Sequence, residues 1–140
     1  MPEFSKKSKE ELKTCHPILQ DIFNEAILHY DHTILEGRRS DERQEKLFKE
    51  GKTKKRAGES KHNKTISEAA DASPYPIPDR WGIADKKEYA RFHLFAGIVI
   101  GIAITYYGDV LRWGGDWDGD GQTNDQTFDD LVHFELKSFN

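Results

Sequence analysis

Two histidines and an aspartate in this chain could hold a metal ion. His62 is followed by Asp71, and His133 lies near the end of the sequence. Imidazole nitrogens and a carboxylate are ligands of open zinc sites, in which three protein groups hold the metal and the fourth position is left for water. Asp130 lies three residues before His133 and could be the base beside that water. The pattern predicts a small zinc hydrolase.

Each of these residues also has a plainer interpretation. A lone histidine is more often a surface or core residue than a ligand, and an aspartate after two alanines could begin a turn. The grouping favours the metal site, because His62 and His133 lie in polar, Gly- or Asp-rich surroundings. The other histidines have no comparable neighbourhood: His16, His29, His32 and His93.

Three short motifs carry a resemblance to a known family. They are Ser60-x-His62, Ala69-x-Asp71 and Asp130-x-x-His133. In this order they resemble the zinc peptidases that include D-alanyl-D-alanine carboxypeptidases, vancomycin-resistance D,D-peptidases and the L-alanyl-D-glutamate endolysins of bacteriophages. The resemblance implies that His62, Asp71 and His133 bind zinc and that Asp130 is the base. The gap between His62 and Asp71 is longer than in the commonest form of the family. Asp71 is therefore the ligand that the resemblance supports least.

The phage endolysin branch is the part of the family that this chain resembles most. The shortness of the chain and the segment Arg112–Trp117 before the last motif carry this resemblance. It implies a peptidoglycan stem peptide as the partner, cleavage between L-Ala and D-Glu, and host lysis as the outcome. Two alternatives stay open: a D,D- or L,D-carboxypeptidase with the same zinc centre, and a metal-stabilised wall-binding module without catalysis.

The segment Gly37–Ser40 holds a second candidate for catalysis. An arginine between a strand and a helix can project into a cleft and polarise a substrate carbonyl, although a solvated arginine is the plainer interpretation. The family carries a Gly-x-Arg-Ser segment here, followed by a glutamine, and Arg39 and Gln44 match those positions. The resemblance therefore implies Arg39 as the electrophile and Gln44 as a supporting group.

An acidic loop follows the segment Arg112–Gly115. Aspartates at alternate positions followed by glycine are typical of the first half of a calcium loop, but the second half does not match. The carboxylates are Asp116, Asp118, Asp120 and Asp125. A calcium site and a solvated acidic turn stay as alternatives, and the resemblance to phage enzymes with a cation-responsive loop implies calcium regulation.

Hydrophobic spacing predicts the elements that must position these side chains. Apolar residues recur at steps of three and four over Ile18–Tyr30, which predicts a helix with one buried face. A short strand is expected over residues 33–36. The next helix is expected over residues 41–50, between Ser40 as its N-cap and Gly51 as its stop.

The most apolar run of the chain is Phe92–Ile104. A membrane span needs about 20 apolar residues, and this run is shorter and is entered by charged residues. We therefore expect a central buried helix against which the sheet packs, and no membrane insertion. Gly97 and Gly101 in this helix would let another backbone come close.

The last part of the chain is expected to form strands at residues 110–113 and 134–139. Asp130 and His133 cannot share a face of a regular strand, since side chains alternate with a period of two. We therefore expect a turn between them. The sequence predicts an α+β fold, in which one small domain over residues 1–140 has an antiparallel sheet packed against helices and a zinc site at the cleft.

Composition limits the classes of protein that fit. A chain of 140 residues suits one domain, and a formal net charge of −4 gives no support for a nucleic-acid binder. The single cysteine, Cys15, excludes an internal disulfide and fits a reducing cytoplasm. The first residues are charged, so we expect no signal peptide. We also expect a monomer that stays in the host cytoplasm until it is released to the cell wall.

Overall fold

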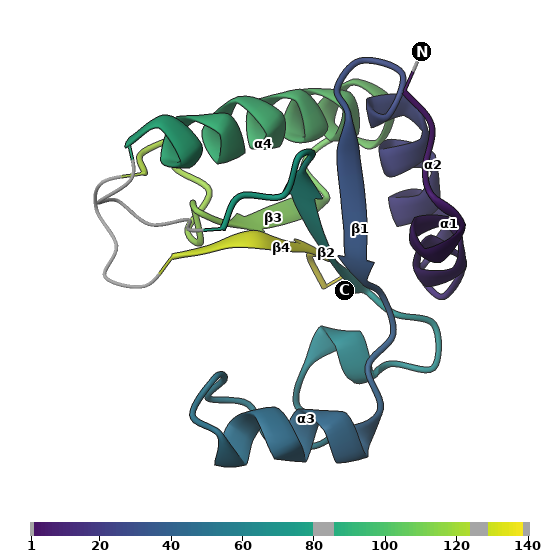
Figure 1. Cartoon of the computed structure of the whole chain (residues 1–140), viewed down its shortest axis with the longest axis vertical. Coiled ribbons are helices and arrows are strands. Elements are labelled where there is room, and N and C mark those ends of the chain that lie inside the picture. The colour runs from purple at the N-terminus through teal and green to yellow at the C-terminus, as the bar shows by residue number, and fades with distance from the viewer. Residues whose placement is uncertain (1, 80–85, 124–128, 139–140) are drawn as a thin grey trace.

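A four-stranded antiparallel sheet forms the centre of the fold (Figure 1). The computed structural model describes residues 2–79, 86–123 and 129–138. The strands are β1 (His32–Glu36), β2 (Ala69–Pro74), β3 (Leu111–Gly114) and β4 (Asp130–Leu136), arranged in the order β1-β2-β4-β3. The predicted α+β class, with an antiparallel sheet packed against helices, is confirmed.

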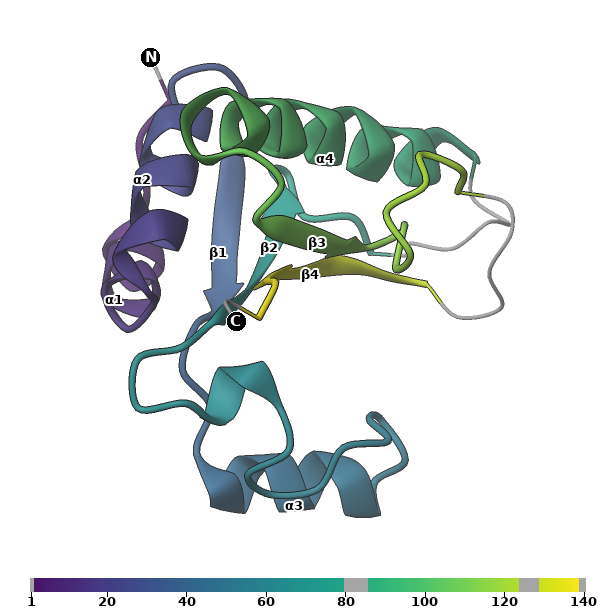
Figure 2. The ribbon, with the colours of Figure 1, turned by 180° about the vertical axis from the view of Figure 1, so that it is seen from behind.

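The described residues also form helices. They are α1 (Lys6–Lys13), α2 (Pro17–Ala26), α3 (Asp41–Lys49), the 3-10 helix η1 (Lys61–Asn63) and α4 (Lys86–Tyr107). Helix α4 runs along one side of the sheet, and α3 lies at the opposite end of the molecule (Figures 1 and 2). The Ser40 hydroxyl accepts a hydrogen bond from the Arg43 amide, so the predicted N-cap of α3 is confirmed. Helix α1 was not predicted, because few of its residues are apolar.

One face of the sheet packs against α2 and α4 and forms the core. Phe134 of β4 lies with its ring 5.6 Å from that of Phe23 in α2 and 5.8 Å from that of Phe95 in α4. Trp113 of β3 stacks on Phe134 from the neighbouring strand. These residues are fully or almost fully buried. Since side chains alternate along a strand, the residues on either side of Phe134 face the other way.

Helix α4 is only in part the buried helix that was expected. One side packs into the core through Phe92, Phe95 and Val99, whereas Leu94 and Ile104 are exposed by 59% and 58%. The helix has 22 residues, and in the described part of the chain it is the one helix long and apolar enough to cross a membrane by length and composition.

The two glycines of α4 do not have the role predicted for them. No atom of the described residues lies within 4 Å of a Cβ built at Gly97 or Gly101. In the part of the chain that the structure describes, no other backbone therefore packs against these two glycines. Both residues lie on the outer side of the helix, away from the sheet.

Candidate metal centre

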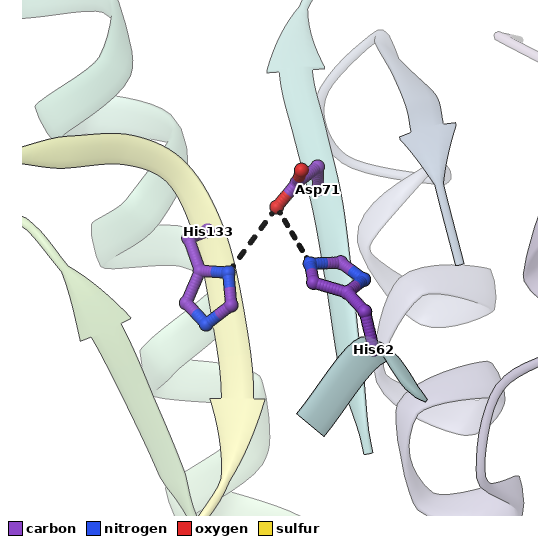
Figure 3. A group of neighbouring side chains, drawn as sticks. All are labelled: His62, Asp71 and His133. Carbon is purple, nitrogen blue, oxygen red and sulfur yellow. Dashed lines mark hydrogen bonds and ion pairs between the residues drawn. The ribbon is translucent and has the colours of Figure 1, made fainter. Parts of the chain in front are cut away.

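His62, Asp71 and His133 come together from three elements of the fold (Figure 3). His62 lies in η1, Asp71 lies in β2, and His133 lies opposite Asp71 on the neighbouring strand β4. His62 Nε2 is 3.2 Å and His133 Nδ1 is 3.3 Å from the same oxygen, Oδ1 of Asp71. Residues of three motifs thus meet at one point, as the resemblance implied, and the third motif comes from a distant part of the sequence.

These distances fit a zinc ion. Zinc bonds to histidine nitrogen and carboxylate oxygen are 2.0–2.2 Å long, so ligand atoms around a tetrahedral zinc are about 3.4 Å apart. The 3.2 and 3.3 Å separations at Asp71 Oδ1 are close to that value. His62 is 1% and His133 is 9% exposed, so both rings are fixed by their surroundings. The donor set therefore suits a metal with nitrogen and oxygen ligands.

The second nitrogen of each histidine is held by the protein. His62 Nδ1 lies 2.6 Å from the Gly37 carbonyl oxygen, and His133 Nε2 lies 2.9 Å from Glu135 Oε1. Metal-binding histidines generally donate their other N–H to a carbonyl or carboxylate, which fixes the nitrogen that faces the metal. Both rings have this arrangement, which leaves Nε2 of His62 and Nδ1 of His133 directed at Asp71.

Gly37 can supply its carbonyl only because it has no side chain. A Cβ at this position would lie 2.2 Å from Thr14 Oγ1 and 2.3 Å from the Glu11 carbonyl oxygen. The chain therefore passes close to the end of α1 here. The glycine that ends the predicted strand is thus part of the support of His62.

Electrostatics in the centre favour an ionised carboxylate between two histidines. Burial alone would raise the pKa of Asp71, but hydrogen bonds with His133 and His62 lower it well below its usual value. Burial lowers the pKa of His133, but its contacts with Asp71 and Glu135 outweigh this effect and raise the pKa to about 9. The carboxylates of Asp71 and Glu135 therefore favour a positive charge at this place, either a proton on His133 or a bound metal ion.

Arg39 lies beside the centre and is held by several groups. Its Nε and Nη2 donate to Glu36 Oε1 at 2.8 and 2.6 Å, and Nη1 donates to Gln44 Oε1 at 3.0 Å. Nη2 also lies 3.4 Å from Asp71 Oδ2. Gln44 is fully buried and donates to the Lys55 carbonyl, so the side-chain amide that contacts Arg39 is itself held in place. A guanidinium has five N–H groups, and two of them are on Nη1. Among the described residues Nη1 contacts only Gln44, so its second N–H keeps no partner there.

An irregularity in β1 brings Glu36 to this place. Ile34 pairs with Ala72, but Glu36 rather than Leu35 pairs with Asp71, so the register shifts by one residue. Such a bulge turns a side chain to the other face of the sheet. Glu36 thereby lies on the face of Asp71 and can hold Arg39.

Asp130 is the first residue of β4 and is partly buried. Burial raises its pKa, the charge of Asp71 raises it further, and the charges of His133, His62 and Arg39 oppose this. The predicted base therefore lies within the electrostatic reach of the centre.

The turn expected between Asp130 and His133 does not form. Strand β4 is continuous, and the irregularity lies in its pairing with β3, because Trp113 pairs with Phe134 whereas Gly114 pairs with Asp130. A Cβ at Gly114 would lie 2.1 Å from the Asp130 carbonyl oxygen. The irregularity at this place is therefore a break in the pairing of β4 with β3 and not a turn within β4.

Besides Glu36, three residues near the centre were missed by the sequence analysis. Glu135, which is 4% exposed, has its Oε2 3.5 Å from Lys61 Nζ and 3.7 Å from Arg112 Nη1. The signal for Glu135 was the alternation of a strand, which places it on the same face as His133. The positions of Lys61 and Arg112 beside it depend on η1 and β3 and had no local signal.

The acidic loop brings three of its four predicted carboxylates together. Ligand oxygens of Asp116, Asp118 and Asp120 lie within 4.8 Å of one another, and Asp125 lies outside the described residues. Gly121 donates its amide to Asp116 Oδ2 at 2.9 Å. Burial raises the pKa of Asp116, and the neighbouring carboxylates Asp118 and Asp120 also raise it. A cation would relieve this repulsion.

Comparisons with known proteins agree with the resemblance. Residues 2–137 match the family model of the phage L-alanyl-D-glutamate peptidases, and the chain belongs to this family. Among solved structures it is similar to the Serratia marcescens L-Ala D-Glu endopeptidase ChiX, with a TM-score of 0.68 and 23% identity over 96% of this chain and 90% of that chain. At this identity the likeness shows the fold. No curated protein matches the sequence.

Proposed function

We propose that this chain is a zinc-dependent endopeptidase that cleaves the L-Ala–D-Glu bond of peptidoglycan stem peptides. The observation that carries the proposal is the convergence of His62 Nε2 and His133 Nδ1 on Asp71 Oδ1, at zinc-like separations. Membership in the phage L-alanyl-D-glutamate peptidase family supports the choice of bond. A carboxypeptidase and a wall-binding module remain as outcomes that experiment can distinguish.

His62, Asp71 and His133 would hold the zinc ion. When bound, zinc supplies a Lewis acid for the scissile carbonyl and a water of lowered pKa. Asp130 accepts a proton from the attacking water and transfers it to the nitrogen of D-Glu as the C–N bond breaks, giving a carboxylate on L-Ala and a free amine. The raised pKa of Asp130 suits a group that must both accept and return a proton.

Arg39 adds a permanent positive charge beside Asp71. Its remaining N–H can donate to the oxygen that becomes negative when water adds to the carbonyl. Glu36 and Gln44 hold the guanidinium in place from two sides. Arg39 is thus proposed to orient Asp71 and to stabilise the oxyanion.

The biological act proposed for this peptidase is lysis of the bacterial host as a phage endolysin. The phage family supports it. On this proposal the enzyme is made in the host cytoplasm and acts when it is released to the cell wall. Retention of the protein inside cells that do not lyse, with lysis when a membrane-permeabilising protein is co-expressed, would support this order of events.

Digestion of purified peptidoglycan, with identification of the new amino termini, tests the proposed reaction. The zinc-loaded protein should release D-Glu amino termini, and this release should stop on chelation and return with zinc. Release of terminal D-Ala would show a carboxypeptidase instead. Firm binding to the wall without any product would favour the binding module.

A calcium ion in the acidic loop is proposed as a second cofactor. The support is the grouping of Asp116, Asp118 and Asp120, whose hard oxygen ligands suit calcium. Calcium should then raise the melting temperature of the zinc-loaded protein, and Asp118→Asn together with Asp120→Asn should remove this effect. A melting temperature and an activity that do not respond to calcium would exclude the cofactor.

A further inference from the structure

Two cations lie on the face of the sheet that carries the metal centre, and they share one carboxylate oxygen. Lys61 Nζ is 3.5 Å and Arg112 Nη1 is 3.7 Å from Glu135 Oε2, whereas Glu135 Oε1 faces His133. Arg112 pairs directly with Glu135, which lies two positions from His133, so these side chains share a face. One negative charge thus stands between two positive ones, and this group of three carries a net positive charge.

A second carboxylate on this face is held much more tightly by its cations. Glu36 Oε1 accepts from Arg39 Nη2 at 2.6 Å, and Glu36 Oε2 accepts from Arg43 Nε at 2.5 Å. These distances are those of short charge-assisted hydrogen bonds. The distances of 3.5 and 3.7 Å at Glu135 exceed the usual hydrogen-bond length. The cations at Glu135 therefore keep donors for an external anion.

Arg112 is the more accessible of the two cations at Glu135. Its side chain is 41% exposed, against 19% for Lys61. Lys61 Nζ also donates to the Leu136 carbonyl oxygen, which holds it within the fold. A ligand that enters along the sheet would therefore meet the Arg112 guanidinium first, with the Lys61 charge behind it.

The proposed substrate supplies a matching anion. A glutamate residue has two carboxyl groups, and its amino group forms the bond to L-Ala. At most one carboxyl can continue the peptide, so the other is a free carboxylate unless it is amidated. This group is only a few covalent bonds from the nitrogen of the scissile amide, and it must lie close to the metal centre during cleavage.

We propose that Arg112, assisted by the charge of Lys61, binds the free carboxylate of the D-Glu residue. The inference rests on the proposed endopeptidase function and adds a recognition site for the residue on the amine side of the scissile bond. A guanidinium can bind a carboxylate through two parallel hydrogen bonds, which fixes both position and orientation. Glu135 then has two roles, since one oxygen holds His133 and the other keeps the cations beside the metal centre.

A pair of synthetic stem peptides tests this site. In one peptide the free carboxyl of D-Glu is a carboxylate, and in the other it is an amide. The wild-type zinc enzyme should cleave the acid with a kcat/KM on the order of 10- to 100-fold higher, the range of one charged hydrogen-bond pair. Arg112→Gln should cleave both peptides at the rate of the amide, and Arg112→Lys should restore part of the preference.

Arg91→Gln provides the matched control, because Arg91 is bound to Glu88 and to the Pro76 carbonyl, in α4 on the other side of the sheet. This variant should keep the full preference for the acid. Zinc content is measured for every variant, so that loss of metal is separated from loss of recognition.

The outcomes separate this inference from the proposed function. Cleavage at the L-Ala–D-Glu bond with the same acid-to-amide ratio in wild type and zinc-loaded Arg112→Gln would overturn the carboxylate site alone. Failure of the wild-type zinc enzyme to cut this bond in either peptide would overturn the proposed function as well.

Discussion

The two faces of β4 are stabilised by different interactions, although their residues alternate along one strand. Phe134 faces α2 and α4 and packs against other aromatic rings. His133 and Glu135 face the opposite way and are held by hydrogen bonds and ion pairs. Packing on one face fixes the position of the strand, and the polar face uses that fixed position to place ligand atoms. Stability and chemistry should therefore respond to different substitutions on neighbouring residues.

The largest effect on chemistry is expected for Asp130→Ala. Loss of a general base lowers the rate of catalysis by about 10²- to 10⁴-fold. Zinc should stay bound, because Asp130 is not among the three ligands, and the free energy of unfolding should not fall, since burial and Asp71 already disfavour the charged form of Asp130. Peptide cleavage, zinc content and urea denaturation are measured together.

Asp129→Ala is the matched control for this variant. Asp129 is the neighbouring carboxylate and accepts a hydrogen bond from Tyr89 at 3.0 Å. The control should keep its activity. A folded, zinc-loaded Asp130→Ala protein with normal turnover would remove Asp130 from the mechanism.

The largest effect on stability is expected on the other face of the strand. Phe134→Ala removes a fully buried ring and should lower the free energy of unfolding by about 3–5 kcal/mol. Leu94→Ala in α4, where the side chain is 59% exposed, should change it by less than about 0.5 kcal/mol. Equal effects of the two substitutions on the urea midpoint would show that the face against α4 is not the core.

Acid should weaken the core face through His32. This ring lies 4.6 Å from Phe95 and 4.9 Å from Phe4, and burial lowers the pKa of His32 to about 4. Between pH 6.5 and 4 the unfolded chain then binds a proton that the folded chain does not. The free energy of unfolding should fall by about 3 kcal/mol as the pH decreases through this range.

Replacement of His32 by Phe should remove this contribution. The difference in unfolding free energy between wild type and His32→Phe, followed from pH 7 to pH 4, isolates it from other acidic groups. His29→Phe controls for the loss of an exposed imidazole. A difference that does not change with pH would contradict a buried neutral His32.

The smallest of these effects is expected for Glu135→Gln. The substitution keeps the shape of the side chain but weakens its hold on His133 Nε2, which lies 2.9 Å away. Loss of such a partner lowers metal affinity by about 10- to 100-fold. Competition with a zinc chelator measures this, and an unchanged zinc affinity would mean that Glu135 does not orient the ligand.

The sequence was most informative where residue type decides the chemistry. The resemblance of three motifs indicated His62, Asp71 and His133. The Ser40 cap indicated the start of α3, and the apolar spacing indicated α2. All these depend on local features of the chain. The comparison of ligand spacing with the family left Asp71 open, and the structure brings it to the same point as the two histidines.

The parts that could not be predicted depend on register between strands. The bulge that turns Glu36 toward Asp71 and the irregular pairing beside Asp130 arise from contacts between segments far apart in the chain. The same is true of Lys61, which reaches Glu135 from η1. A period of two applied to β4 predicted a turn, because it took each strand as regular.

The central claim is that the polar face of the sheet holds zinc between His62, Asp71 and His133. X-ray diffraction from zinc-soaked crystals, measured on both sides of the zinc absorption edge, tests it most directly. We expect an anomalous peak about 2.0–2.2 Å from His62 Nε2, His133 Nδ1 and a carboxylate oxygen of Asp71. Zinc bound only at the acidic loop, or no peak between these three residues in an active enzyme, would contradict the account.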